Sequence, residues 1–172
     1  MKLYSKRLFY RKLLLRDATH EYLSWLNNKK INKYLEIRFE KQNMRNLRNY
    51  LKTISKNKNE YLFGIFIKDD NKHIGNIKLG PIDWHNKKSF IGIMIGDQNF
   101  WGSGIGTESV KTLVNFSFKK LKLKKIMASC HEENEASKKI FMKSGFKIEG
   151  KFSKDAVLGK RRVNTIWLGI NA

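Results

Sequence analysis

The spacing of apolar residues predicts the helices of this chain. Met44, Leu47, Leu51 and Ile54 recur at intervals of three and four residues, which indicates an amphipathic helix over residues 43–54. Further helices are expected after the N-cap candidates Asp17 and Thr19, over residues 104–120 and over residues 135–144.

Segments rich in β-favouring residues predict the strands. Residues 61–68 and 73–79 flank the turn-forming sequence Asp69-Asp70-Asn71, which is typical of a β-hairpin. Residues 90–95 are continuously apolar, which indicates a central strand covered on both faces. The other expected strands lie at residues 8–16, 125–131, 146–152 and 163–170. Because the chain shows no internal repeat or linker, we expect one mixed α/β domain spanning residues 1–172.

Composition supports a folded protein in a reducing compartment. The 172 residues are 41% hydrophobic and 12% aromatic, which is too apolar for a disordered basic tail. No apolar run reaches the roughly 20 residues that a membrane helix needs, and residues 1–10 carry charges where a signal peptide is apolar. The single cysteine, Cys130, permits no internal disulfide. We therefore expect a soluble, cytoplasmic protein, either monomeric or homodimeric.

The charge raises the alternative of a nucleic-acid-binding module. A net charge of +21 attracts polyanions. However, 28 of the basic residues are Lys and only 8 are Arg, whereas base-reading and bidentate phosphate contacts favour Arg. The lysines are scattered without a detached basic arm, so specific nucleic-acid binding is not the preferred interpretation.

The clearest chemical signal is a glycine-rich turn between an apolar strand and a helix. Gly102, Gly104 and Gly106 let the backbone approach a ligand, and the following helix presents unpaired N–H groups and the positive end of its dipole. This geometry binds phosphate. Thr107 and Glu108 stand where a Walker loop needs Lys and Ser/Thr, and the G-x-G-x-G spacing differs from the Rossmann fingerprint. The alternative is a turn whose glycines serve only chain reversal.

A second motif follows further along the chain. Asn134-Glu-Ala-Ser137 precedes Gly145-Phe146 and Glu149-Gly150. Together with Trp101-Gly-Ser-Gly-Ile-Gly106, these motifs resemble the GCN5-related N-acetyltransferase (GNAT) family, in the branch of the ribosomal-protein alanine, spermidine and amino-sugar acetyltransferases. The resemblance covers residues 7–170 and is strongest over residues 74–150. Trp stands at the position where many members of the family have Gln or Arg.

The resemblance implies the GNAT fold, in which one central mixed, mostly antiparallel sheet of about seven strands is flanked by helices. The sheet would splay between strands 90–95 and 125–131, and acetyl-CoA would lie in that notch. Its pantetheine amides would pair with the strand edge at residues 93–95, and its pyrophosphate would bind the amides of residues 102–107. Asn134 would hydrogen bond the pantetheine arm, and it is also a good helix N-cap. The residues expected to bind acetyl-CoA are therefore Ile93, Met94, Ile95, Trp101, Gly102, Ser103, Gly104, Ile105, Gly106, Thr107, Asn134 and Ser137.

The catalytic groups are less well defined by the sequence. Transfer from a thioester to an amine needs a neutral amine and a donor for the departing thiolate. Many relatives donate from a Tyr at the position of Phe141, which cannot donate, so Ser137 is the candidate, with a helix-start hydroxyl as its alternative role. Asp83, His85 and Asp155 are the candidates for the general base, and ordinary solvated loop residues are the alternative.

The remaining reactive residue types point to structural roles. Cys130 lies on an apolar strand without a base at a recognisable spacing, so we expect a small buried residue. The four histidines, among them His73 and His131, show no metal-ligand spacing, and no metal is expected. Glu108 is expected to interact with the helix dipole.

The acceptor must be inferred from charge. A strongly basic surface repels polyamines and basic protein tails and attracts a substrate that carries phosphates. This favours the primary amine of a nucleotide-linked amino sugar, a small and anionic partner. Acetylation of a protein N-terminus, as in the ribosomal-protein alanine acetyltransferases, is the alternative.

Overall fold

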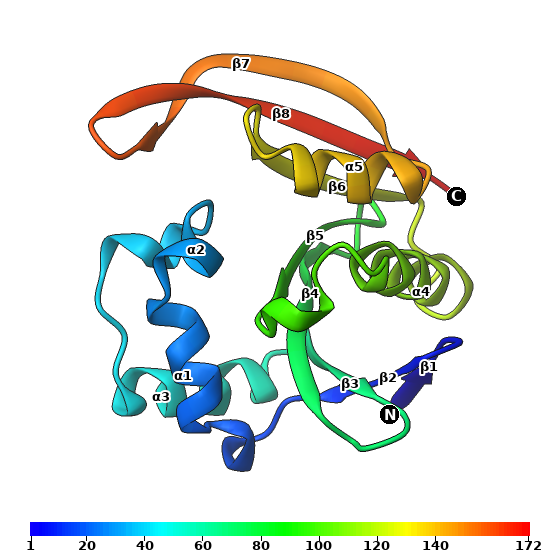
Figure 1. Ribbon diagram of the computed structural model, residues 1–172. Helices are drawn as coiled ribbons and strands as arrows, with labels where there is room; N and C mark the ends of the chain where they lie inside the picture. Colours follow the sequence, from blue (N-terminus) through cyan, green and yellow to red (C-terminus); the bar gives the residue numbers. More distant parts are fainter.

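The computed structural model describes residues 1–172, and its centre is one eight-stranded sheet. The strand order is β1-β2-β3-β4-β5-β6-β8-β7, and only the β5–β6 pair is parallel. This confirms the expected mixed, mostly antiparallel sheet (Figure 1). The strands are β1 (Lys2–Tyr4), β2 (Leu8–Lys12), β3 (Tyr61–Ile67), β4 (His73–Asp83), β5 (Lys88–Ile95), β6 (Lys125–His131), β7 (Lys147–Leu158) and β8 (Arg161–Asn171).

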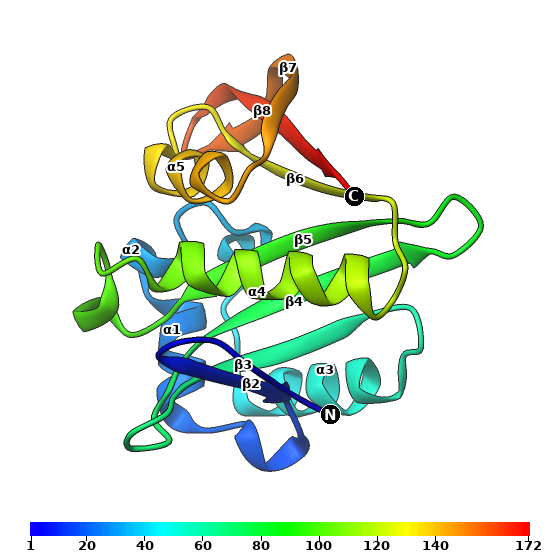
Figure 2. The same ribbon diagram turned by 90° about the vertical axis from the view of Figure 1, so that its right-hand side faces the viewer.

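Helices cover both faces of the sheet, as Figure 2 shows. One face carries α4, whose Val110, Leu113 and Val114 join the strands in the larger apolar core. The other carries α1 and α3, which pack through Trp25 and Leu51 in a second core. The helices are α1 (His20–Asn27), α2 (Lys29–Asn32), α3 (Met44–Lys56), α4 (Ile105–Lys119) and α5 (Glu135–Lys143), with 3-10 turns η1 (Leu15–Asp17), η2 (Glu36–Phe39) and η3 (Gln98–Phe100).

Local side chains fix where several helices begin. Thr19, Asn43 and Asn134 each accept a backbone N–H of the first helical turn, at 3.1, 2.9 and 3.1 Å respectively. These contacts satisfy donors that have no partner within the helix. The N-cap expected at Thr19 is therefore confirmed, and the helix predicted over residues 43–54 is α3.

The sheet splays at its parallel pair. Residues Lys88, Ser89 and Phe90 of β5 pair with β6, and the pairing ends there. Beyond that point Ile93, Met94 and Ile95 are only half-buried. The expectation that residues 90–95 are covered on both faces is therefore wrong for the second half of the strand, because the neighbouring strand diverges. The expected notch is confirmed.

Some boundaries differ from the predicted ones. The strand expected over residues 8–16 ends at Lys12, because Asp17 accepts the N–H of Leu14 and closes the turn η1. The strand expected over residues 73–79 is longer, because β4 continues past its bulge to Asp83. The sequence does not predict the eighth strand, β1, because three residues are too few for a recognisable pattern and the strand forms by pairing with β2.

Candidate active site

The free edge of β5 forms one wall of the site. Once β6 has diverged, the strand edge at Ile93–Ile95 faces a cavity instead of another strand. The indole N–H of Trp101 donates to the carbonyl of Ile95 at 2.9 Å, so this side chain lies against the end of the strand. Trp101 itself is 46% exposed and forms part of the cavity wall. The wall is therefore built from main chain and one indole.

The glycine-rich turn presents a row of unpaired backbone donors. Gly102 and Gly104 have φ angles of 73° and 81°, in the left-handed region where a side chain is strained. Gly104 is the N-cap of α4, and the first helical N–H to find a backbone acceptor is that of Glu108. The N–H groups of residues 102–107 donate no backbone hydrogen bond within the protein. Such a row is a binding site for an anion.

The turn is tied to the start of the chain by an ion pair. Arg7 donates from its side chain to Glu108 at 2.8 Å and to the carbonyl of Ser103 at 2.9 Å. Glu108 also accepts the hydroxyl of Ser5 and the backbone N–H of Arg7. Burial would raise the pKa of Glu108, but the hydrogen bonds from Arg7 and Ser5 outweigh it and hold the pKa below its usual value. Glu108 therefore anchors the N-terminal segment as well as standing in the first turn of α4.

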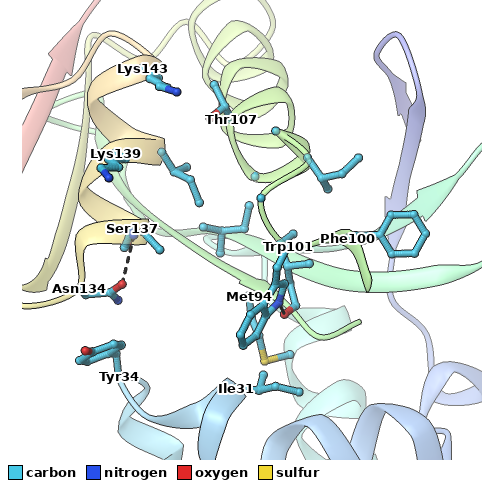
Figure 3. A pocket seen from close by; sticks show the side chains of 18 of the residues that line it. Ile31, Tyr34, Met94, Phe100, Trp101, Thr107, Asn134, Ser137, Lys139 and Lys143 are labelled. Carbon is cyan, nitrogen blue, oxygen red and sulfur yellow. Dashed lines mark hydrogen bonds between the residues drawn. The ribbon is translucent and has the colours of Figure 1, made fainter. Parts of the chain in front are cut away.

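The opposite wall is the start of α5. The amide oxygen of Asn134 accepts the N–H of Ser137 at 3.1 Å, which caps the helix and leaves the amide nitrogen of Asn134 without a partner in the protein. The hydroxyl of Ser137 lies within hydrogen-bonding reach of the thiol of Cys130. In Figure 3, Ser137, Lys139 and Lys143 lie along α5 on one side of the cavity, and Trp101 and Thr107 lie on the other. This geometry is compatible with both expected roles of Asn134, as the N-cap of α5 and as a hydrogen-bonding partner of the pantetheine arm.

These elements enclose a cavity of about 580 Å³. Its lining is mostly apolar, with a few polar groups at the turn and on α5, which suits a long ligand with polar groups at intervals. Eleven of the twelve residues expected to bind acetyl-CoA border it, and the other, Ser103, lies within the turn. The eleven residues that border the cavity are Ile93, Met94, Ile95, Trp101, Gly102, Gly104, Ile105, Gly106, Thr107, Asn134 and Ser137.

A second cavity, of about 570 Å³, adjoins the first. Tyr34 and Leu35, between α2 and η2, border both. Asp155 borders the second cavity and accepts the hydroxyl of Thr165 at 2.6 Å. The other residues that line it are Glu36, Arg38, Phe39, Ser129, Cys130, His131, Ala156, Val157, Thr165 and Trp167.

The other two candidates for the general base lie elsewhere. Asp83 and His85 belong to the β4–β5 hairpin and border neither cavity. Asp83 accepts both the N–H and the side chain of Asn86, and these hydrogen bonds lower its pKa. The hairpin lies at the start of β5, about 23 Å along the strand from Ile95. The structure therefore brings Asp155 to the site and separates Asp83 and His85 from it.

Several residues of the site carried no sequence signal. Arg7, Tyr34 and Leu35 come from the first forty residues, far along the chain from both motifs. The basic residue before an apolar strand and the aromatic residue between two short helices are common patterns, so neither marks a site. Only the fold brings them to the notch.

No group of three or more His, Cys, Asp or Glu side chains is arranged to hold a metal ion. None of the helices has the length and apolar character needed to span a membrane.

A splayed sheet with a free strand edge beside a turn of unpaired N–H groups is the arrangement expected of an acyl-CoA-dependent transferase. A sequence model described as "Acetyltransferase (GNAT) domain" matches residues 7–147. The chain therefore belongs to the GNAT acetyltransferase family and is an acetyl-CoA-dependent N-acetyltransferase. This confirms the family expected from the two motifs and selects the enzyme over the nucleic-acid-binding module.

Individual relatives agree with this assignment. An uncharacterized N-acetyltransferase, p20, from Bacillus licheniformis is 30% identical over 150 residues, which are 86% of this chain and 83% of that protein. The spermidine N-acetyltransferase of Vibrio cholerae, solved with CoA and spermine, has a TM-score of 0.86 at 21% identity and covers 96% of this chain and 95% of its own. RimL, an alpha-N-acetyltransferase of a ribosomal protein solved with coenzyme A, has a TM-score of 0.89 at 18% identity, covering 99% and 98%.

Proposed function

We propose that the first cavity binds acetyl-CoA and that the second receives the amine acceptor. The observation that carries the proposal is the row of unpaired N–H groups at residues 102–107, beside a free strand edge. A pyrophosphate supplies oxygens for the N–H groups, and the amides of a pantetheine arm can pair with the edge at Ile93–Ile95. Arg7 supports this site from outside by fixing the carbonyl of Ser103.

The charges around the first cavity suit this ligand. Lys30, Lys139 and Lys143 border the cavity, and none of them has a carboxylate within salt-bridge distance. Lysines without carboxylate partners offset the negative charge of phosphates. The polar ends of the cavity therefore match a cosubstrate that carries phosphates at one end and amides along its length.

Ser137 is proposed to assist the departing thiolate. Its N–H donates to the capping Asn134, and its hydroxyl lies at the wall of the first cavity with the thiol of Cys130 beside it. When the amine nitrogen attacks the acetyl carbon, the C–S bond breaks and sulfur takes the electron pair. A hydroxyl beside that sulfur can donate a proton to it. Asn134 can hydrogen bond the pantetheine arm through its free amide nitrogen.

The acceptor class is proposed from the second cavity. Asp155 offers a carboxylate to an ammonium group, whereas Lys154, Lys160 and Arg162 near the tip of the β7–β8 hairpin lack carboxylate partners. Glu36, the other carboxylate of the lining, is paired with Arg38, so Asp155 is the carboxylate left for an ammonium group. The cations of the β7–β8 hairpin lie outside the lining and favour an anionic group joined to that amine. A nucleotide-linked amino sugar has both parts, and a protein N-terminus followed by acidic residues is the second candidate.

A panel assay with acetyl-CoA and detection of free thiol tests the acceptor. We expect turnover of UDP- or dTDP-linked 4-amino sugars. Turnover confined to a peptide N-terminus would select the second candidate, and turnover confined to spermidine would contradict an anionic acceptor. Calorimetry with acetyl-CoA alone tests the first cavity independently of the acceptor, and binding at micromolar strength is expected.

A further inference from the structure

The second cavity contains a buried imidazole that has no partner in the protein. His131 is the last residue of β6, is 5% exposed and borders this cavity. Its Nδ1 atom is buried without a hydrogen-bond partner, one of only two such side-chain atoms in the structure. Buried polar atoms are rarely left unpaired, so an orphaned nitrogen beside a cavity indicates a ligand-binding or catalytic role.

The chain geometry places this imidazole close to the junction of the two cavities. Its ring packs edge to face against Tyr34, with ring centroids 5.4 Å apart and an interplanar angle of 77°, and Tyr34 borders both cavities. The carbonyl of His131 accepts the N–H of Asn134 at 2.9 Å, so one tight turn leads from the imidazole to the start of α5 and Ser137. His131 therefore lies on the acceptor side and Ser137 on the side of the first cavity.

The surroundings keep this imidazole neutral. Burial and the nearby Arg38 lower the pKa of His131, while Glu36 and Glu133 oppose that shift. No carboxylate hydrogen bonds the ring, which would otherwise hold it as the imidazolium. Among the ionisable groups around it, Tyr34 contacts the ring, Arg38, Glu36 and Glu133 act on its charge, and Cys130 and Asp155 share the lining of the cavity.

We propose that His131 is the general base that accepts the proton of the acceptor amine. The inference rests on the proposed function, because it requires the amine in the second cavity. The nitrogen lone pair forms the bond to the acetyl carbon and the N–H proton passes to the imidazole. The C–S bond breaks, and sulfur takes a proton from Ser137. The proton on His131 then returns to Ser137 through water, so the products are the amide and the free thiol of CoA.

This assignment gives Asp155 a different role from that of a base. Its carboxylate accepts the hydroxyl of Thr165 at 2.6 Å and attracts the acceptor as an ammonium, which releases one proton to solvent before the neutral amine attacks and passes its second proton to His131. A neutral imidazole is better suited to remove a proton near neutral pH, because its ring nitrogen keeps a free lone pair there. The two side chains then divide binding and deprotonation between them.

Removal of the imidazole tests the proposal. We expect His131→Ala to lower kcat by about a hundredfold at pH 7 with the best amine of the panel, and to bind acetyl-CoA as tightly as the wild type by calorimetry. The acid limb of the kcat–pH profile should be lost, and added imidazole should restore turnover. His85→Ala is the matched control, because His85 is exposed on the β4–β5 hairpin, and its kcat should not change.

The outcomes separate this inference from the proposed function. An unchanged kcat and pH profile in His131→Ala would overturn the role of His131 while leaving the cavities' assignment intact. A loss of turnover that imidazole does not rescue, together with lost acetyl-CoA binding, would reduce His131 to a structural residue. Failure of the wild type to bind acetyl-CoA would refute the proposed function itself.

A second measurement does not depend on turnover. The four histidines give separate ring-carbon correlations in an NMR pH titration, and the signal of His131 is assigned by its absence from His131→Gln. We expect the neutral form of His131 at pH 7, with and without acetyl-CoA. An imidazolium at that pH would overturn the proposal, because it cannot accept a proton.

Discussion

The two cavities that meet at Tyr34 are built in different ways. The first is lined mainly by two continuous stretches, residues 93–107 and 134–143, and its donors are largely backbone N–H groups. The second is lined by side chains from β6, β7, β8 and the segment around η2. Backbone donors bind the constant groups of a shared cosubstrate whatever side chains surround them. Side chains from distant strands can change independently, so we expect the second cavity to set the choice of acceptor.

The largest effect is expected when the backbone geometry of the first cavity is disturbed. Gly104→Val places a branched side chain at a φ of 81°, where it is strained and redirects the unpaired N–H groups. We expect acetyl-CoA affinity, measured by calorimetry, to fall by about a hundredfold.

Gly159 supplies the matched control for that strain. It has a φ of 63° with open space around it, and it lies in the β7–β8 turn, outside both cavities. Gly159→Val should show a comparable loss of stability with unchanged acetyl-CoA binding. Normal binding by Gly104→Val would refute the pyrophosphate position.

A smaller effect is expected from the hydroxyl on α5. Ser137→Ala keeps the backbone N–H that Asn134 caps, so the fold should be unaffected. We expect kcat to fall by about tenfold or more, with little change in the dissociation constant of acetyl-CoA. Steady-state kinetics and calorimetry measure the two quantities. If kcat is unchanged, Ser137 is only a helix-start residue.

A substitution in the second cavity should change the KM of the amine acceptor and leave acetyl-CoA binding unchanged. In Asp155→Asn the side chain retains its shape and can still accept the hydroxyl of Thr165, but it loses the charge that attracts an ammonium group. We expect the KM of the amine to rise by about fivefold, and the affinity for acetyl-CoA to stay unchanged. Asp83→Asn, on the distant hairpin, is the control. A loss of acetyl-CoA affinity in Asp155→Asn would show that the two cavities are not separate.

The smallest effect concerns the one ion pair that supports the backbone-lined cavity. Since the folded-state pKa of Glu108 is lowered, its interactions with Ser5 and Arg7 stabilise the fold above the unfolded-state pKa of about 4.5 and are lost as pH falls through the folded-state value. Glu108→Gln should therefore lower stability by about 1 kcal/mol at pH 7. Thermal melts should show this difference shrinking below pH 4.5. A difference that is constant with pH would contradict the ionic role.

The sequence predicted most helices and strands, but it did not predict the edge strand or the point where the sheet opens. Periodicity located α3, because Leu47, Leu51 and Ile54 face one core. It did not predict β1, which has no pattern of its own and depends on β2 as a partner. The continuous apolar run of β5 suggested cover on both faces, but the pattern cannot report that β6 diverges after Phe90.

The candidate site divides in the same way. The glycine turn and the Asn134–Ser137 motif could be recognised because a helix N-terminus and an N-cap depend on neighbouring residues. The three candidates for the base could not be ranked from the sequence. Asp155 borders the second cavity, whereas Asp83 lies on a hairpin where its carboxylate accepts the N–H of Asn86. The sequence around a loop carboxylate does not show whether it borders a cavity, because that depends on how the strands pair.

Local chemistry was therefore determined by the sequence itself: the left-handed glycines, the free N–H groups of α4 and the cap of α5 each require only a few consecutive residues. The tertiary structure decided which side chains meet across long separations. Arg7 reaches Ser103, Tyr34 packs on His131, and Thr165 holds Asp155 only after the sheet has formed. The physical reason is that hydrogen-bonding geometry within a turn is set by neighbouring backbone angles, whereas contacts between distant segments depend on strand register and on where the sheet opens.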